Sequence, residues 1–168
     1  MQKAHVLLVD DEKDFVDIMK ERLELAGYTV TACYDVEQAL KEVQADEYDV
    51  AVIDLIMPET DGITAMRKIK IIRPLMECIV FSGQGTLRMA VESMKQGAFD
   101  FLEKPCDHKV VTQIIDEACA RKHEHDNRIR KAASKVYSRL EQAMVGATFA
   151  EAGQFDTAKE ILRKKEEE

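Results

Sequence analysis

The chain lacks tryptophan and is poor in the other aromatic residues. Of its 168 residues, 6% are aromatic, whereas 46% are hydrophobic and 33% are charged. A core built from this composition must therefore be mainly aliphatic. The length is suited to one core domain with an appendage and is short for two full domains.

Long apolar runs and closely spaced cysteines are also absent. No apolar run approaches the ~20 residues of a membrane-spanning helix, and the N-terminus has no apolar core followed by a small-residue cleavage site. The four cysteines form no C-x-x-C pair, which argues against a zinc or thioredoxin-like site and favours buried thiols in a reducing compartment. We therefore expect a soluble, cytoplasmic protein without a membrane segment.

The charge is unevenly distributed. The net charge is -8, which argues against a nucleic-acid surface over the chain as a whole. Residues 1–120 hold 13 Lys and Arg against 23 Asp and Glu, whereas residues 121–168 hold 11 against 9. The change in composition predicts a main domain over residues 1–121 and an extension over residues 122–168.

Short apolar runs alternate with segments of helical periodicity. Such alternation predicts parallel strands covered by helices on both faces, in a doubly wound five-stranded sheet of the α/β class with strand order 2-1-3-4-5. Each strand is expected to be followed by its helix. The expected strands are 5–9, 28–33, 49–53, 78–81 and 99–102, and the expected helices are 13–26, 36–45, 64–72, 86–96 and a long one from residue 110.

Polar residues end most of these strands. Asp10 and Asp11 follow the first strand, Asp54 follows the apolar run VAVI of the third, Ser82 ends the fourth, and Lys104 follows the fifth. Because ligands bind at the carboxyl ends of parallel strands, where the strand order reverses, we expect these five side chains to converge.

The converging groups suit phosphoryl chemistry. Three neighbouring carboxylates repel one another, and Mg²⁺ with its preference for oxygen ligands would relieve this repulsion. Lys104 supplies a positive charge for phosphoryl oxygens and Ser82 supplies a hydroxyl donor. A carboxylate can itself act as a nucleophile, and Asp54 is the best candidate because it is the single acid on the central strand.

The arrangement of these residues resembles that of a known protein family. Residues 5–121 resemble the receiver domain of two-component response regulators, and the stretch QGAFDFLEKP is similar to receivers of the nitrogen-regulator class. The resemblance rests on several spaced motifs, namely Asp10-Asp11, Asp54 within DLIMP, Asp61-Gly62, Ser82-Gly83 and Lys104-Pro105.

The resemblance implies that Asp54 accepts a phosphoryl group from a histidine of a sensor kinase or phosphotransfer protein. It implies that Mg²⁺ is held by Asp11, Asp54 and the backbone carbonyl of Ile56, with Asp10 acting through water. The only catalysis expected is that of the chain's own phosphorylation and hydrolysis, so we expect no separate enzymatic activity.

The resemblance also assigns residues around the phosphoryl group. It implies that Ser82 and Lys104 bind phosphoryl oxygens, and that the small Gly83 leaves room for the group to enter. Phe101 occupies the family's aromatic switch position, where tyrosine is common, and Pro105 is the candidate for a cis peptide bond. The hypothesis is that phosphorylation draws Ser82 inward and that Phe101 fills the vacated space.

The extension contains no ATPase loop and no convincing helix-turn-helix, so we expect neither an ATPase nor a DNA-binding domain. Apolar residues recur with heptad spacing, which leaves open whether this helix packs on its own chain or pairs with a second copy. We call them the heptad seam, formed by Ile129, Ala133, Val136, Leu140, Ala143, Ala147 and Ala150.

The stretch FAEAGQFDTAKEIL, which follows in the extension, resembles a tetratricopeptide-type helical hairpin. One such hairpin cannot bury its own face, so it needs the receiver, a second copy or another protein to pack against. The leading interpretation is thus a response regulator whose output is protein association.

Three alternatives remain. A haloacid-dehalogenase-type phosphatase needs an acid two residues after its nucleophile, where this chain has Ile56. A flavodoxin-like flavin binder is disfavoured by the acidic edge, and DNA binding through the extension is disfavoured by its small net charge.

Overall fold

The computed structural model describes residues 4–58, 60–84 and 86–151. The chain divides into two units, residues 1–125 and 126–168, which are considered separately. The hairpin expected at FAEAGQFDTAKEIL lies mostly outside the described residues, as do the side chains at the end of the heptad seam.

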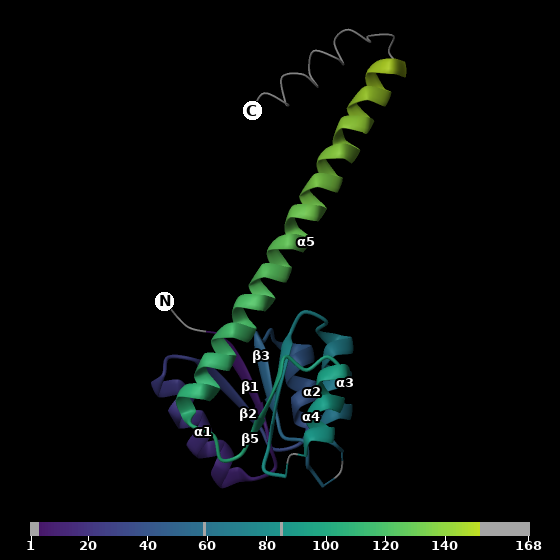
Figure 1. The fold of residues 1–168 in the computed structure, drawn as a ribbon. Coiled ribbons are helices and arrows are strands. Elements are labelled where there is room, and N and C mark those ends of the chain that lie inside the picture. The colour runs from purple at the N-terminus through teal and green to yellow at the C-terminus, as the bar shows by residue number, and fades with distance from the viewer. Residues whose placement is uncertain (1–3, 59, 85, 152–168) are drawn as a thin grey trace. The chain divides into compact units, whose positions relative to one another are not determined.

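The first unit is built on one parallel sheet with the strand order β2-β1-β3-β4-β5 (Figure 1). This order confirms the predicted doubly wound fold. The strands are β1 (His5–Val9), β2 (Thr29–Cys33), β3 (Val50–Ile53), β4 (Glu77–Ser82) and β5 (Asp100–Glu103), and the helices are α1 (Lys13–Leu25), α2 (Val36–Ala45), α3 (Gly62–Ile72), α4 (Leu87–Lys95) and α5 (His108–Glu151).

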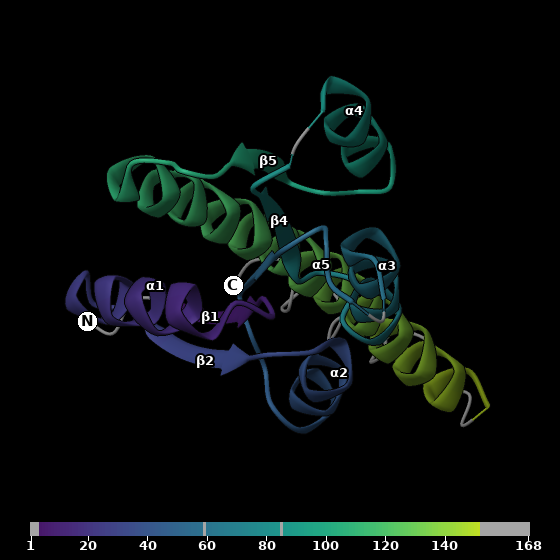
Figure 2. The ribbon, with the colours of Figure 1, turned by 90° about the horizontal axis from the view of Figure 1, so that it is seen from below.

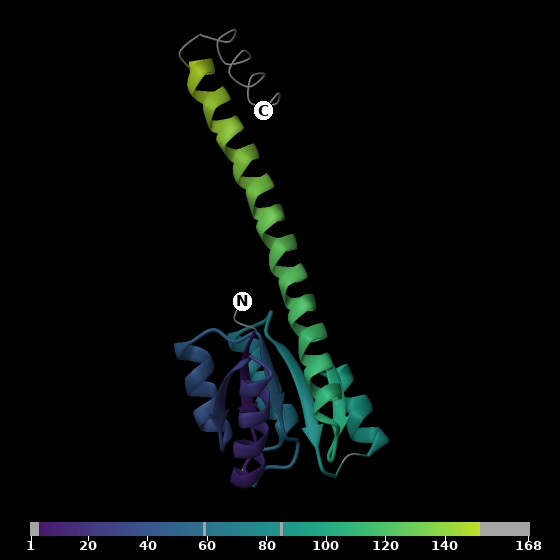
Figure 3. The same ribbon diagram turned by 90° about the vertical axis from the view of Figure 1, so that its left-hand side faces the viewer.

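Helices cover both faces of the sheet. Helices α2, α3 and α4 lie on one face, and α1 and the first part of α5 lie on the other (Figure 2). Figure 3 looks onto the face covered by α1 and α5. The inner strands β1, β3 and β4 therefore bury nearly every side chain, which is why their sequences are continuous apolar runs.

Side-chain caps set the starts of three helices. Asp35 caps α2, Asp61 caps α3 and Thr86 caps α4, each by accepting a hydrogen bond from a backbone N–H in the first turn. The predicted starts at residues 64 and 86 were therefore wrong by up to two residues.

Helix α4 is weakly buried, because Ser93 is its one fully buried residue and Leu87 is 83% exposed.

Three of the four cysteines are buried, whereas Cys106 is half-buried. Burial raises the pKa of the Cys33, Cys78 and Cys119 thiols to about 12, so these side chains are protonated and act as small apolar groups.

In the part of the chain that the structure describes, no helix has the length and apolar character needed to cross a membrane.

Ion pairs tie α5 to the amino edge of the sheet, opposite the predicted site. Arg121 makes a two-pronged hydrogen bond to the carboxylate of Glu77, which is 3% exposed at the start of β4. The next residue, Lys122, donates to Asp49 Oδ1 at 2.8 Å. Lys70 of α3 lies 3.6 Å from Glu77. A buried carboxylate needs such partners, since an unpaired buried charge is costly.

In the second unit, α5 continues through the heptad seam. Its described apolar members are exposed: Ile129 to 53%, Val136 to 57% and Leu140 to 58%. Ala133 and Ala143 are also exposed. The described part of this helix therefore presents an apolar face to its surroundings.

Replacing Arg121 tests the ion pair at the amino edge. We expect Arg121→Ala to lower the free energy of unfolding by about 2 kcal/mol, because Glu77 stays buried and, among the described residues, keeps only the more distant cation of Lys70. Urea unfolding followed by circular dichroism measures this. The control Arg130→Ala, on the exposed part of α5, should cost less than about 0.5 kcal/mol. Equal stabilities of the two variants would contradict the proposed role of Arg121.

Candidate phosphoacceptor and metal site

The strand order brings four chain segments together at the carboxyl edge of the sheet. Val9 pairs with Ile53 in adjacent parallel strands, so Asp10 and Asp54 leave the sheet side by side. Strand β4 lies next to β3, and the backbone N–H of Lys104 donates to the carbonyl of Ser82 at 2.9 Å. The strand-end residues that the sequence singled out are thus neighbours.

Three carboxylates form the centre of the site. One oxygen from each of Asp10, Asp11 and Asp54 lies within 4.8 Å of the other two. Asp10 and Asp54 are 2% and 6% exposed, whereas Asp11 is open to solvent. Such a set of hard oxygen donors is the kind that Mg²⁺ prefers.

Local backbone hydrogen bonds orient the two buried acids. Asp10 Oδ1 accepts from the N–H of Glu12 at 2.9 Å, and Asp54 Oδ2 accepts from the N–H of Ile56 at 3.2 Å. Asp54 Oδ1 has no hydrogen-bond partner among the described residues, although it is buried. An unsatisfied buried carboxylate oxygen is costly, so this atom is the natural point of attachment for a cation or an electrophile.

Lys104 is the cation at this cluster. Its Nζ lies 2.5 Å from Asp10 Oδ2, 3.7 Å from Asp54 Oδ1 and 3.8 Å from Glu12 Oε1. The side chain is only 11% exposed, so these charges are weakly screened by water. The Lys104-Pro105 peptide bond is cis.

The pKa of Asp54 is raised above its usual value. Burial is the largest cause, and the nearby charge of Asp10 adds to it, whereas Lys104 and the backbone N–H of Ile56 act in the opposite direction. Burial therefore outweighs the single ammonium group. A divalent cation would add the missing positive charge, and the carboxylates present fit one.

The remaining predicted residues differ in how close they lie to this centre. Ser82 is fully buried, and its hydroxyl accepts from the N–H of Gln84 at 3.5 Å. A Cβ on Gly83 would meet only the Lys104 side chain, at 3.8 Å, so an alanine fits at this position. Phe101 is half-buried and packs with the core on the α2–α4 face rather than with the acids. The side chain of Ile56 is 45% exposed.

Two structural features of this site were not predicted from the sequence. Gly62, the first residue of α3, approaches the backbone of Asp54 so closely that a Cβ would lie 2.1 Å from the Asp54 carbonyl oxygen. The second is the pair of rings beside Lys104, from Phe15 and Phe81. The Asp61-Gly62 motif could have signalled the first, whereas no local pattern signals the second.

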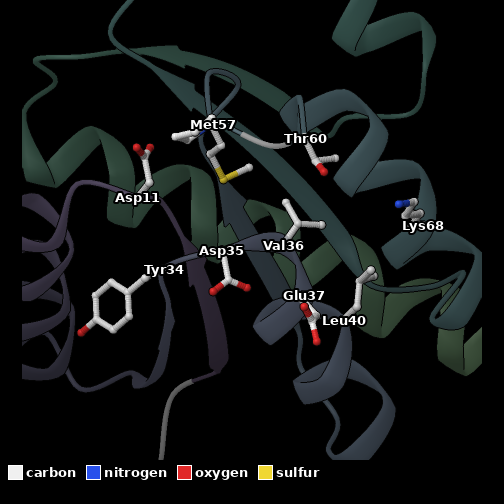
Figure 4. A pocket seen from close by; sticks show the side chains of 10 residues that line it. Asp11, Tyr34, Asp35, Val36, Glu37, Leu40, Met57, Thr60 and Lys68 are labelled. Atoms are coloured by element: carbon white, nitrogen blue, oxygen red, sulfur yellow. The ribbon is translucent and has the colours of Figure 1, made fainter.

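A cleft of about 520 Å³ adjoins the site and shares Asp11 with it (Figure 4). Its wall combines acidic side chains from the start of α2 with Met57 of the loop after β3 and Lys68 of α3. The cleft opens the Asp11 side of the cluster to solvent. This accessibility agrees with the exposure of Asp11.

The comparisons with known proteins agree with this geometry. The model of the response regulator receiver domain matches residues 6–116, which is more than half of the chain. The chain therefore belongs to the response regulator receiver domain family, whose members are signalling components of two-component systems.

Individual relatives cover the same region. The chain is 38% identical over 100 residues to the C4-dicarboxylate transport transcriptional regulatory protein DctD of Rhizobium meliloti, covering 60% of this chain but 22% of that protein. It resembles a receiver domain protein of Clostridium thermocellum (32% identity, TM-score 0.68, 72% and 98% covered). It also resembles the beryllofluoride-activated NtrC4 receiver domain dimer (32% identity, TM-score 0.67, 70% and 98% covered).

Two glycine substitutions test the backbone approach behind Asp54. Gly62→Ala should lower the free energy of unfolding by more than about 2 kcal/mol, because its Cβ would clash with main-chain atoms that cannot move aside cheaply. Gly83→Ala is the matched control and should change it by less than about 0.5 kcal/mol. Urea unfolding of both variants measures the difference. A Gly62→Ala protein as stable as wild type would show that the close approach is not real.

Proposed function

We propose that this chain is a response regulator that accepts a phosphoryl group on Asp54, with Mg²⁺ as cofactor, and signals by changing its association with proteins. The observation that carries the proposal is the buried Asp54 Oδ1, which receives no hydrogen bond from the described residues and lies 3.7 Å from the Lys104 ammonium and beside two further acids. Membership of the receiver family supports the same conclusion.

In the proposed transfer, an oxygen of Asp54 attacks the phosphorus of a phosphohistidine on a sensor kinase or phosphotransfer protein. The new P–O bond forms as the P–N bond breaks, and the histidine nitrogen retains the electron pair of the broken bond. Lys104 is placed to donate to a phosphoryl oxygen, and Ser82 at the end of β4 offers a hydroxyl donor. Catalysis then consists mostly of positioning and charge stabilisation.

The metal proposal rests on the donor set. Asp11 and Asp54, with the carbonyl of Ile56 and with Asp10 nearby, would hold Mg²⁺. When bound, the ion offsets the repulsion among the carboxylates and the incoming phosphoryl oxygens. The charge of Asp10 also raises the pKa of Asp54, although burial is the larger cause.

We propose no enzymatic activity beyond acceptance and loss of the chain's own phosphoryl group. An aspartyl-nucleophile phosphatase needs a second acid two residues after the nucleophile. That position is Ile56, which contributes a backbone N–H to Asp54 and has an apolar side chain. We further propose that the protein acts in the cytoplasm.

The proposed signal passes through β4, β5 and α4. Phosphorylation would draw Ser82 toward the phosphoryl group, and Phe101 would then turn into the space that Ser82 leaves. Phe101 packs against the same core cluster as Met89 of α4, and α4 is the helix that buries least. Weak burial makes α4 the element whose position can change at low cost.

For the output, we propose association with a downstream protein or with a second copy of the chain, rather than with nucleic acid. The exposed heptad seam supports pairing with a second copy, because its apolar side chains repeat at the spacing used by coiled coils. Several seam positions are alanine, whose small side chain buries little apolar area. Pairing through this seam would therefore be weak, and phosphorylation could control it.

Acetyl phosphate and Mg²⁺ provide the test of phosphoacceptance. The intact mass of the wild type should increase by one phosphoryl group, and that of Asp54→Ala should not, because the attacking oxygen is lost. Chelation of Mg²⁺ should prevent labelling of the wild type. The control Asp14→Asn, an exposed acid on α1, should label like the wild type. Equal labelling of Asp54→Ala would refute the assignment.

Sedimentation over a range of concentrations tests self-association. Leu140→Asp should weaken the dimer by at least about tenfold, since it places a charge within the apolar interface. Ser138→Asp, which lies outside the seam on the same helix, should leave dimerisation unchanged. The comparison is made with and without acetyl phosphate. A wild type that stays monomeric in both states would exclude a second copy as the partner.

A further inference from the structure

The Lys104 ammonium lies against aromatic rings as well as carboxylates. Its Nζ is 4.1 Å from the ring centroid of Phe15 in α1 and 5.8 Å from that of Phe81 in β4. Both distances fall within the roughly 6 Å range of cation–π attraction. The two rings are themselves 5.6 Å apart and tilted by 57°.

The nearby carboxylates alone do not place this cation where the proposed transfer needs it. Nζ is closest to Asp10, at 2.5 Å, whereas the phosphoryl group would be attached to Asp54, at 3.7 Å. Glu12 Oε1 lies 3.8 Å from Nζ as well, and each acid beside the ammonium competes with the phosphoryl oxygens for it. An aromatic ring attracts the cation and leaves its charge available, and the low exposure of Lys104 limits competition from water.

We infer that Phe15 is a positioning residue: its ring holds the charged Lys104 side chain beside Asp54, ready to donate to a phosphoryl oxygen. The inference deepens the proposed function and rests on it. Phe15 is half-buried and also packs against the core on the α1 and α5 face. If Phe15 served only to fill the core, any apolar side chain of similar size could replace it. If it positions Lys104, the aromatic ring is required.

Three variants separate these roles. Phe15→Leu keeps an apolar side chain and removes the ring, whereas Phe15→Tyr keeps the ring. Phe99→Leu is the matched control, because Phe99 is half-buried and packs against the same core cluster. Its ring faces a different cation, since Cζ of Arg121 lies 4.3 Å from the ring centroid. The rate of labelling by acetyl phosphate with Mg²⁺ is measured, together with the thermal unfolding of each variant.

We expect Phe15→Leu to be labelled about fivefold more slowly than wild type, and Phe15→Tyr and Phe99→Leu to be labelled at nearly the wild-type rate. A second readout does not depend on phosphorylation. The NMR resonances of the Lys104 side chain should show ring-current shifts in the wild type, Phe15→Tyr and Phe99→Leu, and should lose most of them in Phe15→Leu.

Folded Phe15→Leu that is labelled at the wild-type rate would overturn the inference, and so would Phe15→Tyr that is as slow as Phe15→Leu. A wild-type Lys104 without ring-current shifts would also overturn it, whether or not Phe15→Leu folds. If the wild type gains no phosphoryl group at all, the proposed function is the part that fails. In that case the ring-current shifts still decide whether Phe15 holds Lys104.

Discussion

The structure places the ammonium group of Lys104 against two buried carboxylates, and the carboxyl edge of the sheet is organised around this contact. Asp10 and Asp54 are brought together by the pairing of β1 with β3, and like charges at that distance repel. Lys104 acts against this repulsion, yet the pKa of Asp54 stays above its usual value, mainly because the group is buried and also because Asp10 is nearby. The site is therefore left short of positive charge, which is the condition under which it would bind a metal ion.

The strand order and the members of the acidic cluster could be predicted from the sequence, because both follow from local signals. Buried parallel strands read as apolar runs, and the residue after each run must lie at the carboxyl edge. Helix starts were less predictable. Helix α3 begins at Gly62 rather than at Thr64 because Asp61 caps it, accepting hydrogen bonds from the N–H and the hydroxyl of Thr64.

Contacts between distant parts of the chain could not be predicted. The rings beside Lys104 come from positions 15 and 81, and the partner of Glu77 is Arg121, so no short motif contains either pair. In both cases a charged side chain is stabilised by a distant residue. The sequence around that distant residue predicts only whether it lies in the core or on the surface. Such pairs follow from packing, and composition or periodicity does not contain that information.

The sparse burial of α4 has a consequence for the energy landscape of the receiver. Only Ser93 of this helix is fully buried, and Leu87, Val91 and Met94 are exposed. Detaching α4 from the sheet therefore forfeits less apolar contact than detaching α3, which buries Ala65, Met66 and Ile69. An opening confined to α4 leaves the acidic cluster and the central strands intact, and the amide hydrogens of α4 would exchange with solvent sooner than those of α3.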